Sequence, residues 1–171
     1  WAYYDPLQPI QSFQFASFYF PSLQAEYIDV DDRMAPRRGS GARLMLRGGK
    51  GGADGQATFS QLYVSAQWFY GFKSDSRLIA RGELGHTFTR DVLNLPPSLR
   101  FYAGGDRSVR GYDWHEIGPS LMTSGGTYYT GAPNLLTSSV EYERYFTPTW
   151  GAAAFIDSGS AFDGKHAKMH T

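Results

Sequence analysis

Two long stretches of alternating apolar and polar residues constrain the fold of this chain more than any other feature. In residues 59–72 the apolar side chains fall mainly on even positions. They are Leu62, Val64, Ala66, Trp68, Tyr70 and Phe72. Residues 77–88 repeat the pattern, with Leu78 on one face and Arg81 on the other. A period of two residues indicates a β-strand with two different faces. Only a short turn at residues 74–76 separates the two stretches, so we predict an antiparallel hairpin.

The length of both stretches favours strands that cross a membrane. Strands in soluble proteins usually have ~5–6 residues, whereas ~9–11 residues cross a bilayer at a tilt. Aromatic residues gather near the strand ends, at Trp68, Tyr70, Phe72 and Phe88, as in the interfacial girdle of a transmembrane barrel. A soluble β-sandwich would also alternate, and it is the alternative on pattern alone. We predict that the apolar face contacts lipid and that the Arg, Glu and Gln face lines a polar lumen.

The composition suits β structure and excludes several classes of partner and site. Twelve Tyr, twelve Phe, four Trp and twenty Gly are typical of a β-rich chain. Sixteen basic residues balance sixteen acidic ones, so the chain lacks the electrostatic footprint of a nucleic-acid-binding protein. The absence of cysteine excludes disulfides and thiolate metal sites. No run of ~18 apolar residues is present, so no transmembrane helix is expected.

Five further segments bring the predicted strands to about seven. They are the aromatic first twenty residues and residues 23–32, 41–49, 137–146 and 150–162. The glycine-rich residues 48–55 are interpreted as an inter-strand turn, because they lack the Gly-Lys-Ser/Thr that seats a phosphate. Residues 163–171 show no strand pattern.

Residues 91–136 show no convincing period and are predicted to form one long loop. Pro96-Pro97 and Gly118-Pro119 cannot lie inside a paired strand, because proline offers no N–H to the ladder. A loop far longer than ~12–15 residues is usually functional or disordered. Its aromatic residues include Phe101, Tyr102, Tyr112 and Trp114. These argue against disorder, so we expect an ordered loop that the rest of the fold holds in place.

The block FYAGGDRSVRGYDWHEIGP, residues 101–119, resembles the long sixth loop of the Omp85 superfamily of outer-membrane β-barrels. The hallmark of that loop, V-R-G-[FY], falls here on Val109, Arg110, Gly111 and Tyr112. LPPSLR before the block and IGP at its end are most similar to the TamA branch, named for the translocation and assembly module. DDRMAPRRG, SVEY and FIDSG resemble a turn and two strands of the same superfamily.

The resemblance implies an all-β, membrane-spanning antiparallel β-barrel of sixteen strands, with a long loop folded inward and POTRA domains before it. We expect residues 1–171 to be an interior part of such a barrel, about its second half. The POTRA domains and the final strands are not expected within this chain. About seven strands cannot be the whole barrel, because an open sheet edge in lipid leaves backbone groups unpaired.

Arg110 is the first candidate for a functional site. Glu141 and Asp157 are predicted to face the lumen on adjacent strands, and an arginine between two carboxylates can make strong bidentate hydrogen bonds. A solvated loop arginine is the simpler alternative. The resemblance implies that this arginine clamps the loop to the strands, with Phe155 and Gly159 as further clamp partners. Gly111 permits a tight turn behind the arginine, and Tyr112 can pack on the inner wall.

No enzyme site, metal site or cofactor site is predicted. FIDSG also resembles the catalytic loop of aspartic proteases, but those enzymes need two such aspartates that share a proton, and one copy occurs here. His166 and His170 lie four residues apart in a tail without helical pattern, so they are not expected to bind a metal.

The resemblance implies an integral protein of the bacterial outer membrane that contacts its lipid. Its implied function is to help insert or secrete other β-barrel proteins, with autotransporters as usual clients and a TamB-type protein as periplasm-spanning partner. BamA-type insertases and two-partner secretion pores share the loop motif and are the nearest alternatives. A passive porin, or the barrel of a protein with an enzymatic domain upstream, is the alternative from another class.

Overall fold

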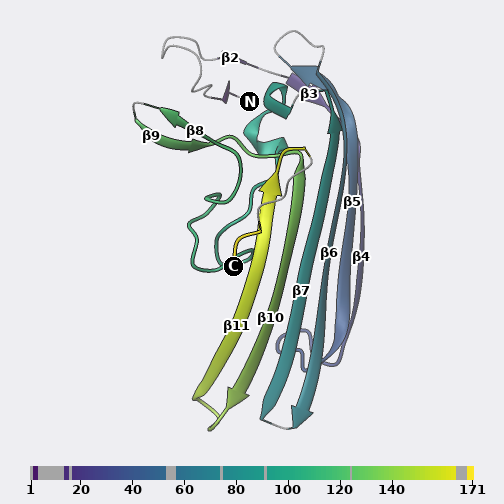
Figure 1. Ribbon diagram of the computed structural model, residues 1–171. Helices are drawn as coiled ribbons and strands as arrows, with labels where there is room; N and C mark the ends of the chain where they lie inside the picture. Colours follow the sequence, from purple (N-terminus) through teal and green to yellow (C-terminus); the bar gives the residue numbers. More distant parts are fainter. Residues whose placement is uncertain are drawn as a thin grey trace.

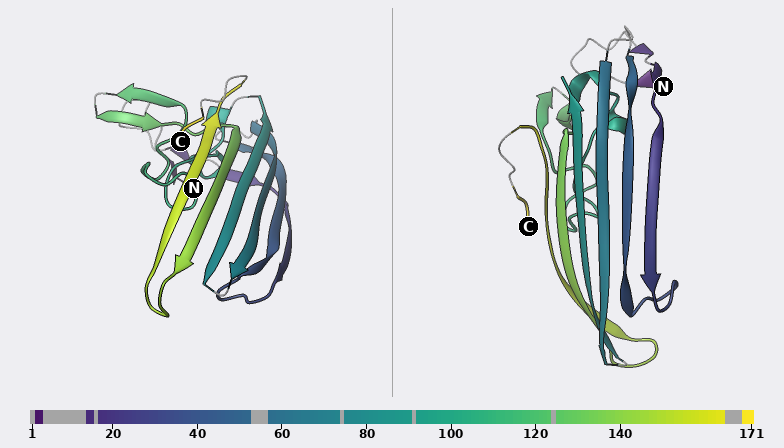
Figure 2. Two further views of the ribbon diagram at one scale, coloured as in Figure 1. Left: turned by 60° about the horizontal axis from the view of Figure 1, so that its bottom comes forward. Right: turned by 90° about the vertical axis from the view of Figure 1, so that its right-hand side faces the viewer.

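The computed structural model describes residues 2–3, 14–15, 17–52, 57–73, 75–90, 92–123, 125–164 and 169–171. Most of them form one antiparallel sheet of seven strands, which curves like a section of a cylinder wall (Figures 1 and 2). Its strands are β3 (Ser17–Tyr19), β4 (Ser22–Val30), β5 (Arg38–Gly52), β6 (Ala57–Lys73), β7 (Ser76–Thr89), β10 (Asn134–Tyr145) and β11 (Gly151–Phe162). The order is β11-β10-β7-β6-β5, and β3 and β4 both pair with β5. The described part of the sheet is open, since β11 does not pair with β3 or β4.

β3 and β4 occupy one strand position that Pro21 interrupts. Tyr19 lies opposite Lys50 and Ser22 lies opposite Arg47, so the register on β5 is the same before and after the break. Proline has no N–H to give to the ladder, but its carbonyl still accepts a hydrogen bond from the Gly48 N–H at 3.3 Å. The seven strands therefore fill six positions across the wall.

The alternation in sequence becomes two different faces of the wall. One row of the outer face joins Leu44, Val64, Leu84 and Leu136 across four strands. The residues next to them along each strand form a row of the inner face, which joins Arg43, Ser65, Glu83 and Thr137. Leu84 is 57% exposed and Val140, also on the outer face, is 50% exposed. An apolar outer face and a polar inner face are what a barrel wall in lipid requires.

Strand length and aromatic placement also fit a membrane-crossing wall. β6 has seventeen residues and β5 has fifteen, more than the ~9–11 needed for a tilted crossing. Trp68, Tyr70, Phe72 and Tyr142 form a chain of ring contacts on the outer face, with centroids 5.0–6.3 Å apart. They lie near the turns that join β6 to β7 and β10 to β11, at the lower end in Figure 1. Among the described residues, no helix is long and apolar enough to cross a membrane.

The connections differ in length at the two ends of the wall. β4 and β5, β6 and β7, and β10 and β11 are joined by short turns at one end, whereas the long segment between β7 and β10 leaves from the other end (Figure 1). In bacterial outer-membrane barrels the short turns are periplasmic and the longer loops are extracellular. The end with the long segment is therefore assigned to the cell exterior.

The turn DDRMAPRRG is organised by its first aspartate. The Asp31 carboxylate accepts hydrogen bonds from the backbone N–H groups of Asp32, Arg37 and Arg38 at 2.9–3.0 Å. The bonds from Arg38 and Arg37 lower the pKa of Asp31. Gly39 ends the turn at φ +127°, where a side chain would also collide with the carbonyl of Asp29. The conformation of the turn thus explains why this motif has aspartate at position 31 and glycine at position 39.

Three expectations about boundaries were wrong. Gly48–Gly52 is not part of a turn but the end of β5, since its residues pair with β3 and β6, and residues 53–55 of the predicted turn lie outside the described residues. β10 begins at Asn134, three residues earlier than the predicted strand. The segment 91–136 is not without secondary structure, because it holds two 3-10 helices and a hairpin. These are η1 (Val92–Asn94), η2 (Pro97–Leu99), β8 (Ser120–Thr123) and β9 (Gly126–Tyr129).

The two ends of the chain are described only in part. Within the first twenty residues the structure has β3 and a small pair, β1 (Ala2–Tyr3) and β2 (Gln14–Phe15). The rest of that predicted strand, residues 1, 4–13 and 16, lies outside the described residues. In the tail, His170 pairs with Gly159 at the free edge of β11, and His166 lies outside the described residues.

A loop-anchoring site on the inner face of the sheet

Arg110 connects the long loop to two strands of the wall. Its Nε and Nη2 donate to the two carboxylate oxygens of Asp157 on β11, at 2.7 and 2.9 Å. Its Nη1 donates to Glu141 on β10 at 2.6 Å, and Nη2 also reaches the Ser139 hydroxyl at 3.2 Å. The backbone N–H of Arg110 adds a bond to Asp157 at 3.0 Å. The structure thus brings together the three residues that the sequence pointed to.

Strand register places the acceptors. Ser139 and Glu141 are two apart on β10, so both side chains point to the inner face. On β11, Asp157 lies opposite Ser139, and Phe155 lies opposite Glu141. These four residues form a compact square into which the guanidinium fits, and the Arg110 Cζ lies 3.5 Å from the centre of the Phe155 ring. A guanidinium on an aromatic face adds a cation–π attraction to the ion pairs.

The site is largely withdrawn from solvent. The exposed fractions of the Arg110, Glu141 and Asp157 side chains are 19%, 12% and 3%. Hydrogen bonding to Asp157, together with that to Glu141, raises the pKa of Arg110 despite the opposing effect of burial. Fixed charge-assisted bonds of this kind are about twice as strong as neutral ones.

The neighbours of Arg110 in the motif fix the course of the loop. Val109 is fully buried, and a Cβ atom on Gly159 would lie 2.7 Å from its side chain, so only glycine leaves room for it there. Gly111 adopts φ +94°, which disfavours any other residue at the turn behind the arginine. Tyr112 packs against the loop core, and its ring meets the His170 ring edge to face at 5.5 Å.

Arg81 is a member of the site that the sequence did not reveal. Its Nη2 donates to the same Glu141 oxygen that Arg110 uses, at 2.8 Å. Arg81 lies on β7, so the charge network spans three adjacent strands, β7, β10 and β11. Alternation alone placed Arg81 on the inner face, but nothing in the sequence paired it with Glu141.

A second anchor, which sequence reasoning also missed, holds the root of the loop on β6 and β7. A Cβ atom on Gly85 would lie 2.5–2.8 Å from the Phe101 ring, so this glycine makes the seat for that ring. Phe101 also stacks on Tyr63 with centroids 6.2 Å apart. The buried Gln61 amide donates to the Leu99 carbonyl at 2.9 Å. The signal available in the sequence was Gly85, because a glycine inside a strand often marks a place where another group approaches closely.

The loop root is itself a folded unit. The Arg100 guanidinium donates to the backbone carbonyls of Leu93, Leu95 and Thr130 at 2.7–2.8 Å. Backbone pairing joins Phe101 to Ala132, on opposite sides of the loop. The core that the loop shares with β10 and β11 consists of Phe101, Ala103, Val109, Ile117, Ala132, Leu135 and Ala161.

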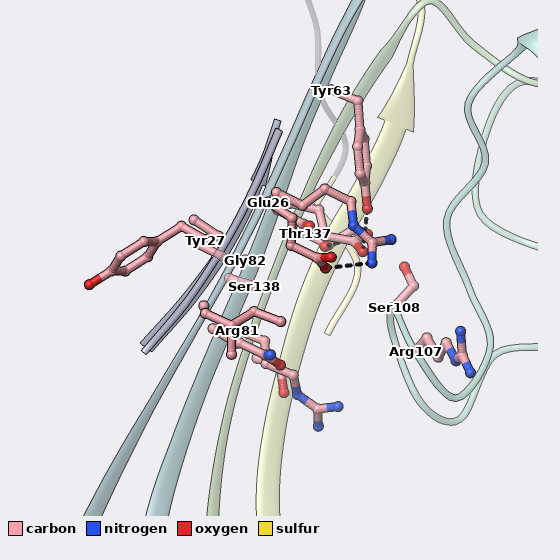
Figure 3. A pocket seen from close by; sticks show the side chains of 18 residues that line it. Glu26, Tyr27, Tyr63, Arg81, Gly82, Arg107, Ser108, Thr137 and Ser138 are labelled. Atoms are coloured by element: carbon pink, nitrogen blue, oxygen red, sulfur yellow. Dashed lines mark hydrogen bonds and ion pairs between the residues drawn. The ribbon is translucent and has the colours of Figure 1, made fainter. Parts of the chain in front are cut away.

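Below the loop tip, a polar pocket of about 380 Å³ separates Arg107 and Ser108 from the inner face (Figure 3). Its wall holds an ion pair between Arg43 and Glu26 at 2.8 Å. The Tyr63 hydroxyl donates to Glu83 at 2.9 Å on the same wall. In the described part of the chain, no group of three or more His, Asp or Glu side chains could hold a metal ion. Charged and hydroxyl groups of the pocket wall thus pair with one another.

A wall with an apolar outer face, a polar inner face and a long loop fastened to that inner face defines a segment of an outer-membrane β-barrel. The profile of the Omp85 superfamily domain matches residues 4–170. The chain belongs to the Omp85 superfamily and is part of an integral outer-membrane protein.

This chain is also similar to two individual proteins. The chain is 27% identical over 136 residues to the outer membrane protein assembly factor BamA of Nitratidesulfovibrio vulgaris, which covers 78% of this chain and 17% of that protein. The crystal structure of BamA from Haemophilus ducreyi lacking POTRA domains 1–3 superposes with a TM-score of 0.69 at 18% identity. That match covers 83% of this chain and 29% of the other. The chain therefore spans less than a third of either relative.

Proposed function

We propose that the protein containing this chain assists the insertion or secretion of other β-barrel proteins at the outer membrane. Membership of the Omp85 superfamily supports this, as does the similarity to two proteins named BamA. The observation that carries the proposal is the Arg110 site, because a loop fastened to β10 and β11 makes a rigid inner support rather than a free constriction. The action is mechanical, with no covalent intermediate, no cofactor and no ATP.

Rigidity in this part of the wall matters because insertion requires strand pairing to be weak at another place in the barrel. An unpaired strand edge exposes a row of N–H and C=O groups that can template a client strand. We place that edge at the seam between the first and last strands of a sixteen-stranded barrel, outside this chain. The Arg110 network then keeps β7, β10 and β11 in register while the seam opens.

Within the superfamily, we propose the TamA branch, with autotransporters among the clients and a TamB-type partner. The similarity of LPPSLR and IGP to that branch supports this proposal. In the structure LPPSLR builds the loop root, where Leu95 and Leu99 are buried and Arg100 makes three carbonyl bonds. A BamA-type insertase is the second candidate, because both relatives described above carry that name.

The test is client assembly in cells whose gene for the full protein has been deleted and replaced by variants. We expect deletion to reduce surface display of an autotransporter, and Arg110→Ala to reproduce at least a tenfold loss. Arg107→Ala is the matched control, since this exposed arginine lies three residues away at the loop tip and outside the network. Equal display in the deletion strain and the wild type would remove the assembly function.

Two measurements separate the alternatives. A large, stable, solute-selective single-channel current, without any effect of deletion on clients, would identify a passive porin. The number of POTRA domains in the full reading frame, and the clients lost on deletion, would separate a TamA-type factor from a BamA-type insertase or a two-partner secretion pore.

A further inference from the structure

The outer face of the wall carries a hollow of about 390 Å³ near its extracellular end, on the side opposite to the lumen. Its lining is mostly apolar. The side chains around it that point outward are Pro21, Leu23, Leu46, Leu62 and Phe88. Leu23 and Phe88 are 68% and 61% exposed, so the hollow is open to the surroundings of the wall.

Small residues on adjacent strands make the hollow. Gly48 on β5 lies opposite Ser60 on β6, and Ser60 lies opposite Phe88 on β7. Gly48 has no side chain to fill the space, and a Cβ atom there would already lie 3.0–3.1 Å from Phe59 and Ser60. Leucines fill the next outer row, Leu46 opposite Leu62, so the floor is lowered at Gly48 and Ser60 only.

The hollow lies where the apolar band of the outer face ends. Below it, toward the short turns, the outer rows are Leu46 with Leu62 and then Leu44 with Val64. Above it, the next outer row pairs the exposed Lys50 with Thr58. Lys50 makes no ion pair with any residue in the described ranges. A cation at the edge of an apolar groove, at the membrane boundary, matches a lipid with an anionic headgroup.

We propose that the hollow seats one acyl chain of a membrane lipid whose phosphate lies against Lys50. The apolar lining offers the acyl chain van der Waals contacts in a fitted groove, and the Lys50 ammonium complements the phosphate. The occupant is a lipid of the outer leaflet, because the hollow lies at the extracellular end of the wall. This inference does not depend on the assembly function, since it uses only the outer face of the sheet.

The test uses the full protein in phosphatidylcholine vesicles with a reporter at the hollow. Phe88→Trp keeps an aromatic ring there, and its fluorescence is taken as the difference from the parent protein. Brominated phosphatidylglycerol or brominated phosphatidylcholine is added as quencher at equal mole fraction. We expect phosphatidylglycerol to show about fivefold higher relative affinity, the effect of one basic residue near an anionic lipid.

Variants in the reporter background assign the effect. Lys50→Gln should bring the ratio of the two affinities to about one, whereas Lys50→Arg should keep it. Arg144→Gln removes an outer-face cation at the opposite rim and should leave the ratio unchanged. Ser60→Leu should reduce quenching by both lipids by filling the hollow, whereas Ser138→Leu, on the outer face of β10, should not.

Three results would overturn the proposal: equal quenching by the two lipids in the reporter protein, a preference that persists in Lys50→Gln, or unchanged quenching in Ser60→Leu. Heat-modifiable electrophoretic mobility restricts the comparison to folded proteins. Because client assembly is not measured, failure here leaves the assembly function untouched.

Discussion

Replacing Arg110 by alanine should release the tip of the long loop but not its root. The substitution removes four side-chain hydrogen bonds, two to Asp157 and one each to Glu141 and Ser139. Glu141 keeps the guanidinium of Arg81, so it is not left without a cation. Asp157 is 3% exposed and loses the only cation that contacts it among the described residues.

The free-energy cost of Arg110→Ala follows from this difference between the two carboxylates, since Glu141 keeps a cation and Asp157 does not. Removing one partner of a buried ion pair costs about 3–5 kcal/mol, because the remaining charge is buried and uncompensated. Since only one of the two carboxylates loses its compensation, we expect the lower end, about 3 kcal/mol. That value raises the population of the opened tip about 100-fold, at 1.4 kcal/mol for each factor of ten.

Trypsin cleavage after Arg107, quantified by mass spectrometry, measures this opening. Arg107 is exposed in the tip, and proteolysis tracks the open population when opening is fast relative to cleavage. Arg100 is an internal control, because its guanidinium is bound to three carbonyls of the root that the substitution leaves intact. Arg110→Lys keeps the charge but loses the bidentate geometry, so it should fall between wild type and Arg110→Ala.

The reasoning fails if Arg110→Ala protein with a folded barrel is cleaved after Arg107 no faster than wild type. Equal acceleration after Arg100 and Arg107 would also refute it, because the root and tip would then open as one unit. In that case the second anchor around Phe101 would not hold the root independently.

Three further predictions concern the wall and its turns. Gly85→Ala should destabilise the protein by about 1–3 kcal/mol in denaturant unfolding, because the new methyl group collides with the Phe101 ring of the loop root. Gly82→Ala on the same strand is the control and should be neutral, because the nearest atom to its new methyl group lies at 3.5 Å. Leu84→Arg on the lipid face should cost about 2–4 kcal/mol of folding free energy in bilayers. Ser65→Arg should cost little, because Ser65 faces the polar pocket. Equal costs for the two substitutions would contradict the assignment of faces. Because the pKa of Asp31 is lowered, its carboxylate stabilises the turn fully above the ordinary carboxyl pKa and progressively less as the pH falls below it. Asp31→Asn should therefore reduce the thermal stability of the protein at pH 7 and make that stability decline less steeply in acid.

Gln61 shows that a residue on the polar face of a strand need not be open to the lumen. Gln61 lies on the inner face, where the alternation would let it meet water and accept a charge. Instead it is 2% exposed under the loop root, and its amide is bound to Thr87 and the Leu99 carbonyl. Ser65, four residues along the same face, lines the open pocket. The period gives the face of a strand, but not what covers that face.

Most of the wall could be predicted from the sequence because β-structure in lipid has a local signal. Alternation in residues 59–72 and 77–88 gave the two faces, and the short turn between them gave the pairing. A boundary was predicted wrongly where glycine removes the signal, at Gly48–Gly52, which pairs as strand although its sequence suggests a turn. The hairpin β8–β9 escaped prediction for another reason, since four-residue strands are too short to establish a period.

The sequence by itself determined that this chain forms strands, which side of each strand meets lipid, and that Arg110, Glu141 and Asp157 belong together. Only the tertiary structure decided which glycines are seats for loop residues, that Arg81 shares Glu141, and that the loop has a second anchor on β6 and β7. Alternation is a property of neighbours in the chain, whereas these contacts join residues 16 to 60 positions apart. A contact of that kind depends on the register of several strands and the course of the loop at once, and no local pattern carries that information.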